Sequence, residues 1–209
     1  MGERLLPEWI ARGRTALLVI DMQTDFASRD GAAGLAGHDL SAVPPALGNA
    51  ARLTASARAA GVPVIFVRLE TSPENDSPAW AERARRHGQS PEQALALCRA
   101  GTRGADLVLV PALAGDLVVT KHRYSAFMGT SLDAVLKERG IDTLVACGLT
   151  TECCVDSTVR DAFHRDYHVF LVGDACASYD STLHDATLRS LDLNFAIVIR
   201  TEEAVAAWI

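Results

Sequence analysis

Six short apolar runs, each rich in Leu, Val and Ile, recur along the 209 residues of the chain. Each run is too short for a helix and lacks polar alternation, which is typical of strands buried on both faces of a parallel sheet. The predicted strands are Thr15–Asp21, Val62–Leu69, Leu117–Lys121, Thr143–Gly148, Val169–Gly173 and Ala196–Arg200. Because such strands need helices over both faces of their sheet, this pattern constrains the fold more than any other feature.

Segments with helical periodicity lie between most of these strands. From Ser41 to Gly61, apolar residues recur every three or four positions, and Pro44 in the first turn fits a helix start. Other helices are predicted over 130–140, from about Glu152, over 181–193 and over 202–209. The alternation predicts an α/β fold with three layers, Rossmann-like, in which helices cover both faces of a six-stranded, mostly parallel sheet.

The length of the chain fits one domain of about 150 residues or slightly more, so residues 1–209 are expected to form a single domain. Residues 71–113 are the exception, because they contain four prolines and charged stretches that could form one or two short helices. Loops of this length in compact domains are often lids or binding insertions. The alternative is a solvated surface excursion.

Charge and cysteine content restrict the partners and the compartment. Lys and Arg number 20 and Asp and Glu number 26, and the net charge of −6 argues against nucleic acid. No apolar run approaches the roughly 18 residues that span a membrane, and residues 1–14 lack the apolar stretch of an export signal. Five cysteines without a C-x-x-C pair disfavour a disulfide framework and a four-cysteine zinc site. We expect a soluble cytoplasmic protein.

Three chemically capable residues follow predicted strands. Ligands of open α/β sheets bind beyond the carboxyl ends of the strands, where Asp21 ends the first strand and Lys121 ends the third. Cys154 falls in the first turn of the helix after the fourth strand, where backbone N–H groups, the helix dipole and a nearby lysine would favour a thiolate. Asp21 could take the thiol proton and deliver it to a leaving group. Together they form a candidate nucleophilic site.

Each of these residues has a structural alternative. Asp21 could cap a helix or loop, and Lys121 could be a surface residue with its stem on apolar surface. Cys153 competes with Cys154, because adjacent helical positions point about 100° apart and at most one is expected to face a pocket. Spacing alone does not choose between them. The remaining cysteines are interpreted as core residues: Cys98, Cys147 and Cys176.

The chain resembles the isochorismatase-like cysteine hydrolase superfamily over nearly its full length, and three stretches carry the resemblance. They are ALLVIDMQTDF at 16–26, KHRYSAF at 121–127 and GLTTECCVDSTVRDA at 148–162. The family pattern T-x-x-C-V-x-x-T-x-x-D-A matches Thr151 to Ala162 and selects Cys154 rather than Cys153 as the nucleophile.

The resemblance also implies local geometry around the nucleophile. Family members carry a non-proline cis peptide, which here would join Leu149 to Thr150. The backbone N–H groups of Thr150 and Cys154 would then form an oxyanion hole, in which a single donor is typically worth about 100-fold in rate.

The segment from Lys121 to Asp133 looks most like the branch that hydrolyses ureidoacrylate, biuret and N-carbamoylsarcosine, although His122 stands where that branch commonly has Pro. The resemblance implies that Cys154 attacks an amide or ureido carbonyl, that a thioester forms, and that ammonia or an amine leaves. Residues expected to line the substrate pocket are Phe26, Trp80, Arg123, Tyr124, Ser125 and Phe127. The alternatives are an Arg123 that faces outward and a Phe127 that belongs to the core.

Two departures from related branches narrow the chemistry. Nicotinamidases of the superfamily bind a metal through Asp-x-His and a further His, whereas residues 67–73 contain no His and His38 precedes Asp39 without that spacing. We therefore expect no metal and no cofactor. Isochorismatases that cleave a vinyl ether typically lack the nucleophilic cysteine, so Cys154 disfavours that reaction.

Alternatives to hydrolysis of a small amide or ureido compound remain open. A wide pocket under residues 71–113 could admit a larger secondary-metabolite amide or lactam. The chain could also be a non-catalytic binding protein that kept the fold. Relatives are usually dimers or tetramers, so we expect a homo-oligomer with a small-molecule substrate and with neither nucleic acid nor a membrane as a partner.

Overall fold

The structure is a computed structural model that describes residues 6–108, 113 and 115–209. Residues 1–5, part of the segment expected not to be an export signal, lie outside the described residues, as do residues 109–112 of the predicted insertion.

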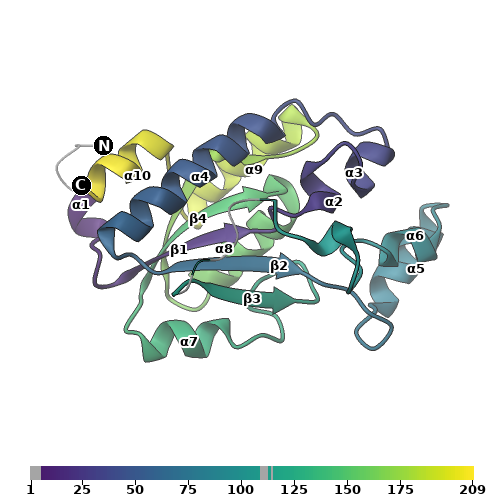
Figure 1. Cartoon of the computed structure of the whole chain (residues 1–209), viewed down its shortest axis with the longest axis horizontal. Coiled ribbons are helices and arrows are strands. Elements are labelled where there is room, and N and C mark those ends of the chain that lie inside the picture. The colour runs from purple at the N-terminus through teal and green to yellow at the C-terminus, as the bar shows by residue number, and fades with distance from the viewer. Residues whose placement is uncertain (1–5, 109–112, 114) are drawn as a thin grey trace.

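Six strands form one sheet in the order β3-β2-β1-β4-β5-β6 (Figure 1). Their bounds are Thr15–Ile20 (β1), Val64–Leu69 (β2), Leu117–Lys121 (β3), Thr143–Leu149 (β4), His168–Ala177 (β5) and Ile197–Ile199 (β6). Each neighbouring pair is parallel, so the sheet predicted as mostly parallel is entirely parallel among the described residues. The central strands β1 and β4 are buried along their whole length, as their unbroken apolar sequences require.

Strand β5 is longer than predicted, because it continues through Gly173 and Asp174 to Ala177. A Gly-Asp pair is typical of a turn, which is why the sequence predicts an end there. In the structure the Asp174 carboxylate accepts hydrogen bonds from the backbone N–H of Thr201, at 2.8 Å, and from its hydroxyl, at 2.9 Å. Because these hydrogen bonds satisfy the carboxylate within the fold, Asp174 is accommodated inside β5, and the strand does not end at the Gly-Asp pair.

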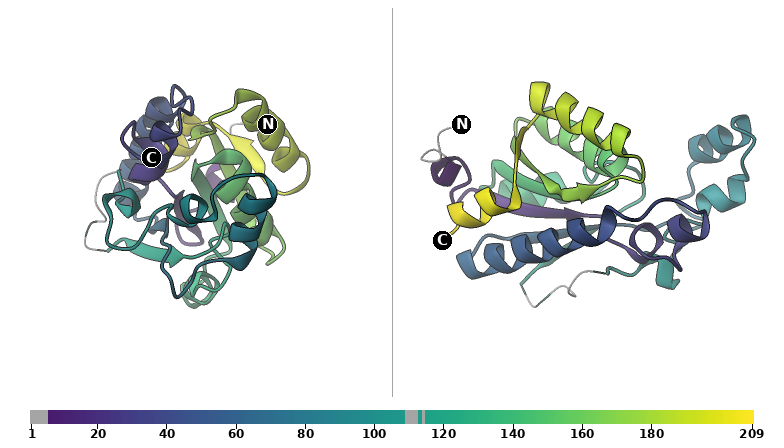
Figure 2. Two further views of the ribbon diagram at one scale, coloured as in Figure 1. Left: turned by 90° about the vertical axis from the view of Figure 1, so that its right-hand side faces the viewer. Right: turned by 90° about the horizontal axis from the view of Figure 1, so that it is seen from above.

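Helices cover both faces of the sheet, as predicted. Helix α4 (Val43–Ala60) and helix α10 (Thr201–Ala207) lie on one face, and α8 (Asp156–Phe163) and α9 (Ser181–Asn194) lie on the other (Figure 2). Right-handed crossovers place α7 (Leu132–Glu138) with α8 and α9. The short helices are α1 (Leu6–Trp9), α2 (Thr24–Ala27) and α3 (Ala32–Leu35).

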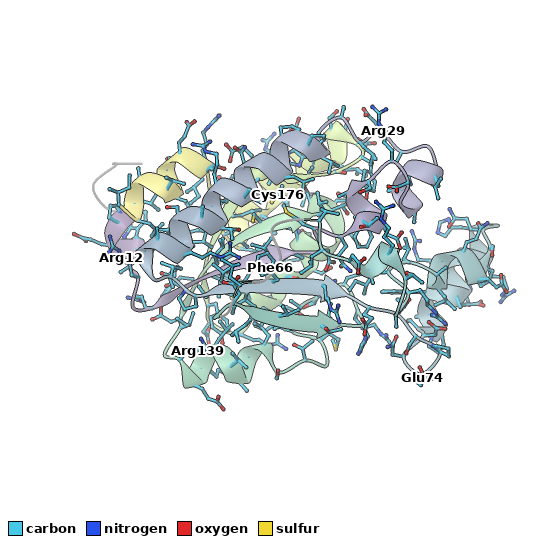
Figure 3. The ribbon with its side chains drawn as sticks, viewed as in Figure 1. Arg12, Arg29, Phe66, Glu74, Arg139 and Cys176 are labelled. Atoms are coloured by element: carbon cyan, nitrogen blue, oxygen red, sulfur yellow. The ribbon has the colours of Figure 1, made fainter. Side chains whose placement is uncertain are left out.

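The apolar core lies between these layers, where Figure 3 labels Phe66 of β2 and Cys176 of β5. The cysteines interpreted as core residues are buried: Cys98, Cys147 and Cys176. No helix within the described residues is long and apolar enough to cross a membrane.

The insertion contains two short α-helices, α5 (Pro78–Arg86) and α6 (Pro91–Leu95), and a 3₁₀ turn, η1 (Arg103–Ala105). Each α-helix begins with proline after a serine N-cap, whose hydroxyl accepts a hydrogen bond from the third residue of the helix. The two helices lie beyond the carboxyl ends of the strands (Figure 1). The insertion therefore sits where a ligand of this fold would bind.

The strand order reverses between β1 and β4, because the chain runs outward to β3 on one side and then crosses back to β4. In doubly wound sheets this switch point leaves a crevice at the carboxyl ends of the strands. Residues that follow β1 and β4 therefore face one another across it.

Candidate active site

Asp21 follows the last residue of β1 and is fully buried. Its φ of +50° lies in the left-handed region, which Asp tolerates better than most residues. Its backbone N–H still donates to the carbonyl of Val67 in β2, at 2.8 Å. The chain thus leaves the strand sharply while Asp21 stays at the centre of the sheet.

Lys121 ends β3, and its side chain is fully buried rather than on the surface. Its Nζ lies 2.7 Å from Oδ2 of Asp21 and 3.3 Å from Sγ of Cys154. It also donates to the backbone carbonyl of Arg123, at 3.0 Å. The lysine ammonium therefore joins the carboxylate to the thiol, and the surface alternative for Lys121 is excluded.

Cys154 lies in η2 (Thr151–Val155), a turn of π-helix between β4 and α8. The peptide bond between Leu149 and Thr150 is cis, as expected from the resemblance. The Thr151 hydroxyl lies 2.8 Å from Nδ1 of His184 on α9, which ties the first residue of the turn to the neighbouring helix. The candidate nucleophile thus lies on a turn whose first residue is bound to α9.

Burial and the neighbouring charges together set the pKa values of the three residues. It raises the pKa of Asp21, although the positive charge of Lys121 opposes this rise. Burial alone would lower the pKa of Lys121, but the charges of Asp21 and Cys154 outweigh it, and that pKa lies above its ordinary value. The ammonium and the carboxylate therefore form a charged, buried pair.

The Cys154 thiol differs from the sequence expectation of a favoured thiolate. Its pKa lies well above the ordinary value because of the neighbouring Cys153 thiol, burial and the Asp21 carboxylate, which together outweigh Lys121. The thiol is therefore neutral at neutral pH and must lose its proton as it reacts. Oδ2 of Asp21 forms an ion pair with Lys121 at 2.7 Å, and a hydrogen bond with the Cys154 thiol is among the contacts that oppose the rise of the Asp21 pKa. Asp21 can therefore accept that proton.

A cavity of about 290 Å³ opens onto Cys154. Five of the predicted site residues line it: Phe26, Trp80, Tyr124, Thr150 and Cys154. The rings of Trp80 and Tyr124 stack with centroids 4.7 Å apart and form one wall. Residues of the insertion that sequence reasoning missed line it as well: Arg83, Ala84, Gln89, Ala94 and Leu97. Their signal in the sequence was only their place in an insertion beyond the strands.

Three residues expected in the pocket do not line this cavity. The Arg123 guanidinium donates to the backbone carbonyls of Asn75, at 2.9 Å, and His122, at 2.6 Å. The Ser125 hydroxyl accepts from the backbone N–H of Phe127, at 3.1 Å. The Phe127 ring belongs to the apolar core. These side chains hold the loop after β3 in place, and the pocket uses Tyr124 from that loop.

Both adjacent cysteines line the cavity, so the expectation that at most one would face it is wrong. The 100° separation applies to an α-helix, whereas both residues belong to the wider π-helical turn. Their surroundings still differ, because Cys154 contacts Lys121, and its side chain is more deeply buried than that of Cys153.

The site brings together residue types for acyl transfer. Within the described ranges, 6–108, 113 and 115–209, no group of three His, Cys, Asp or Glu side chains is arranged to hold a metal ion. What the site does contain is a thiol, a carboxylate, a lysine ammonium in contact with both, and an adjoining cavity. This set fits nucleophilic attack by sulfur on a carbonyl carbon.

Comparison with known proteins places the chain in a family. The isochorismatase domain matches residues 15–203. Ureidoacrylate amidohydrolase RutB of Methylorubrum extorquens is 38% identical over 196 residues, which cover 88% of this chain and 78% of that protein. A cysteine hydrolase from Pseudomonas syringae pv. phaseolicola superposes with a TM-score of 0.78 at 27% identity, over 96% of this chain and 94% of that one. N-carbamoylsarcosine amidase from Thermoplasma acidophilum superposes with a TM-score of 0.68 at 30% identity, over 90% and 97% of the two chains. The chain belongs to the isochorismatase-like hydrolase superfamily.

Proposed function

We propose that the chain is an amidohydrolase that cleaves a non-peptide C–N bond in a small amide, ureido or carbamoyl compound, with Cys154 as nucleophile. One observation carries the proposal. Lys121 Nζ lies 2.7 Å from Asp21 and 3.3 Å from the sulfur of Cys154, which lines a cavity. Two of the similar proteins are named as hydrolases of ureido or carbamoyl compounds, which supports the same bond type here.

In the first half of the reaction, Asp21 takes the thiol proton as the sulfur of Cys154 bonds to the carbonyl carbon. Lys121 stabilises the charged pair, and the oxyanion accepts hydrogen bonds from the backbone N–H groups of Thr150 and Cys154. The C–N bond then breaks, and Asp21 returns its proton to the departing nitrogen. Ammonia or an amine leaves, and a thioester remains on Cys154.

In the second half, water attacks the thioester. Asp21 takes a proton from the water and passes it to the sulfur as the C–S bond breaks, which releases the acid and restores the thiol. The raised pKa of Asp21 suits both directions of this transfer, because a base whose pKa lies nearer to neutrality also returns its proton more readily.

The test is ammonia release from ureido acids, carbamoyl amino acids and primary amides by the wild type and two alanine variants. Cys154→Ala is expected to lower kcat by more than about 1,000-fold. Cys153→Ala is the matched control, one residue away on the same cavity wall, and is expected to retain most activity. Loss of activity in Cys153→Ala and not in Cys154→Ala would overturn the assignment of Cys154 as nucleophile. A wild type that releases no ammonia from any of the three substrate classes would count against the proposed amidohydrolase function.

Two alternatives predict different results. A larger secondary-metabolite amide or lactam needs more room than a cavity of about 290 Å³, at the lower end of the roughly 300–1,000 Å³ typical of ligand pockets. A non-catalytic binding protein of the same fold would not need a reactive thiol. Acylation of Cys154 by the substrate, detected by mass spectrometry and slowed by Asp21→Asn, is expected for an enzyme and would not occur for a binding protein.

We also propose that one domain, with residues 71–113 as a lid, acts as a cytoplasmic homo-oligomer, either a dimer or a tetramer. Five free thiols favour a reducing compartment. A hollow of about 550 Å³ near the amino ends of β5 and β6 includes Phe163 and Leu193, whose exposed fractions are 45% and 79%. Exposed apolar groups around a hollow support self-association. Light scattering after size exclusion tests this, and a monomer at all concentrations would contradict it.

A further inference from the structure

Arg83 brings a charge from the lid into the candidate active site. It lies on α5, which Figure 1 shows beyond the carboxyl ends of the strands, and it lines the cavity that also contains Cys154. Cys154 belongs to the sheet side of this cavity, and Arg83 belongs to the lid. A bound molecule that reacts at Cys154 can therefore reach Arg83 with another part of its structure.

The pairing of the lid arginines sets Arg83 apart. Arg85 and Arg86 both form ion pairs with Glu82, at 2.5 Å and 2.7 Å. Within residues 6–108, 113 and 115–209, Arg83 forms neither an ion pair nor a side-chain hydrogen bond. Its guanidinium therefore keeps its donors free for a ligand.

The rest of the cavity provides no compensating negative charge. Its walls are largely apolar, from Phe26 and Leu69 to Leu97, and the nearby carboxylate of Asp21 is paired with Lys121. Arg83 is exposed overall and lies at the rim of the cavity, where its positive charge opposes the rise of the Tyr124 pKa that burial causes. A cation with free donors at the rim of a cavity attracts an anion and orients it as it enters.

We propose that Arg83 binds a carboxylate at the end of the substrate remote from the scissile carbonyl. The guanidinium matches a carboxylate with two parallel hydrogen bonds. This inference rests on the proposed function, and it narrows the substrate to a small ureido or carbamoyl acid rather than a neutral amide. The cavity of about 290 Å³ fits such a molecule.

The test compares a ureido carboxylic acid with its methyl ester, which keeps the ureido group and removes the charge. For the wild type, kcat/KM is expected to be about 10- to 100-fold higher for the acid. Arg83→Gln is expected to abolish this preference by raising KM for the acid with little change in kcat, because the contact forms equally in the ground state and the transition state. Arg83→Lys keeps the charge and should keep part of the preference.

Arg85→Gln is the matched control, because Arg85 lies on the same helix, does not line the cavity and leaves Glu82 paired with Arg86. It is expected to leave the preference unchanged. An Arg83→Gln variant that loses activity equally on acid and ester, or that keeps the wild-type preference, would overturn the inference, as would a wild type without preference.

Binding separates this inference from the proposed function. In a Cys154→Ala background, calorimetry with the same acid and ester measures affinity without turnover. Tighter binding of the acid, lost when Arg83→Gln is added, supports the role of Arg83 even if the wild type hydrolyses neither compound. Equal binding of acid and ester to the Cys154→Ala protein would contradict it.

Discussion

The chemistry of individual residues depends on a carboxylate and an ammonium that are both fully buried. Such a pair is costly to remove from water, and its attraction repays the cost only while both partners are present. In the proposed mechanism the pair has a chemical use, because Lys121 contacts both the proposed base, Asp21, and the proposed nucleophile, Cys154. The neighbouring Cys153 thiol and burial raise the pKa of Cys154, so in the proposed mechanism the thiol keeps its proton until Asp21 accepts it.

The dependence of kcat/KM on pH should reflect the ionisation of Asp21. The residue must be ionised to act as a base, and burial raises its pKa above the ordinary value of about 4. We therefore expect kcat/KM to fall on the acid side at a pH clearly above 4. Lys121 opposes the rise, so the residual activity of Lys121→Met should have an acid limb at still higher pH. A limb near pH 4 in the wild type would contradict this account.

The buried pair should also show strong energetic coupling. Lys121→Met and Asp21→Asn each leave one buried charge without its partner, and each is expected to cost about 3–5 kcal/mol in the free energy of unfolding. The double variant should cost clearly less than the sum, as urea denaturation can measure. The exposed pair of Lys137 and Asp133 is the control, with an expected coupling below about 1 kcal/mol. Additive costs at the buried pair would show that it does not act as a unit.

At the scale of elements, Asp25 ties the lid to the first loop. Its carboxylate accepts hydrogen bonds from the backbone N–H of Cys98, at 2.7 Å, and of Ala32, at 3.1 Å. A side chain at Gly104 would meet the same carboxylate at 2.3 Å, so η1 packs directly on it. The part of the lid around Cys98 is thus held close to the residues that follow β1, and Trp80 of the cavity wall packs against the cluster that contains Cys98.

Loss of this tie should loosen the lid. Asp25→Ala leaves a buried N–H without an acceptor, and we expect faster proteolysis within residues 71–105 and a several-fold rise in KM. Asp30→Ala removes only an exposed ion pair with Arg103 and is the control, with little expected effect. Equal proteolysis of both variants would contradict a special role for Asp25.

Two glycines should respond in opposite ways to alanine. Gly148 in β4 has φ of +147°, and an added Cβ would lie 2.1 Å from the backbone oxygen of Ile20. Gly148→Ala is therefore expected to destabilise the protein by several kcal/mol, about 3 or more, and to disturb the site that follows β4. Gly48 lies within α4 with open space around it, and Gly48→Ala should stabilise by about 0.5–1 kcal/mol. Equal effects on the urea midpoint would contradict the packing argument.

At the scale of the whole molecule, strand periodicity predicted the sheet, and the ends of strands predicted Asp21, Lys121 and Cys154. The carboxyl ends of parallel strands meet at one edge of the sheet, so residues at these ends can be expected to lie close together before the structure is known. The described part of the lid consists of short helices and turns rather than strands of the sheet, so the sequence does not place its side chains. Arg83 and Gln89, which the lid contributes to the cavity, were missed for that reason. The resemblance, rather than spacing, distinguished Cys154 from its neighbour, because the π-helical turn brings both to the cavity.

The most direct test is to find the covalent intermediate. The wild type is mixed with a ureido acid, quenched in acid within milliseconds to seconds and digested, and the peptide that contains both adjacent cysteines is sequenced by mass spectrometry. The account predicts the acyl mass on Cys154, retained in Cys153→Ala and absent in Cys154→Ala. An acyl group on Cys153, or turnover that survives Cys154→Ala, would contradict it.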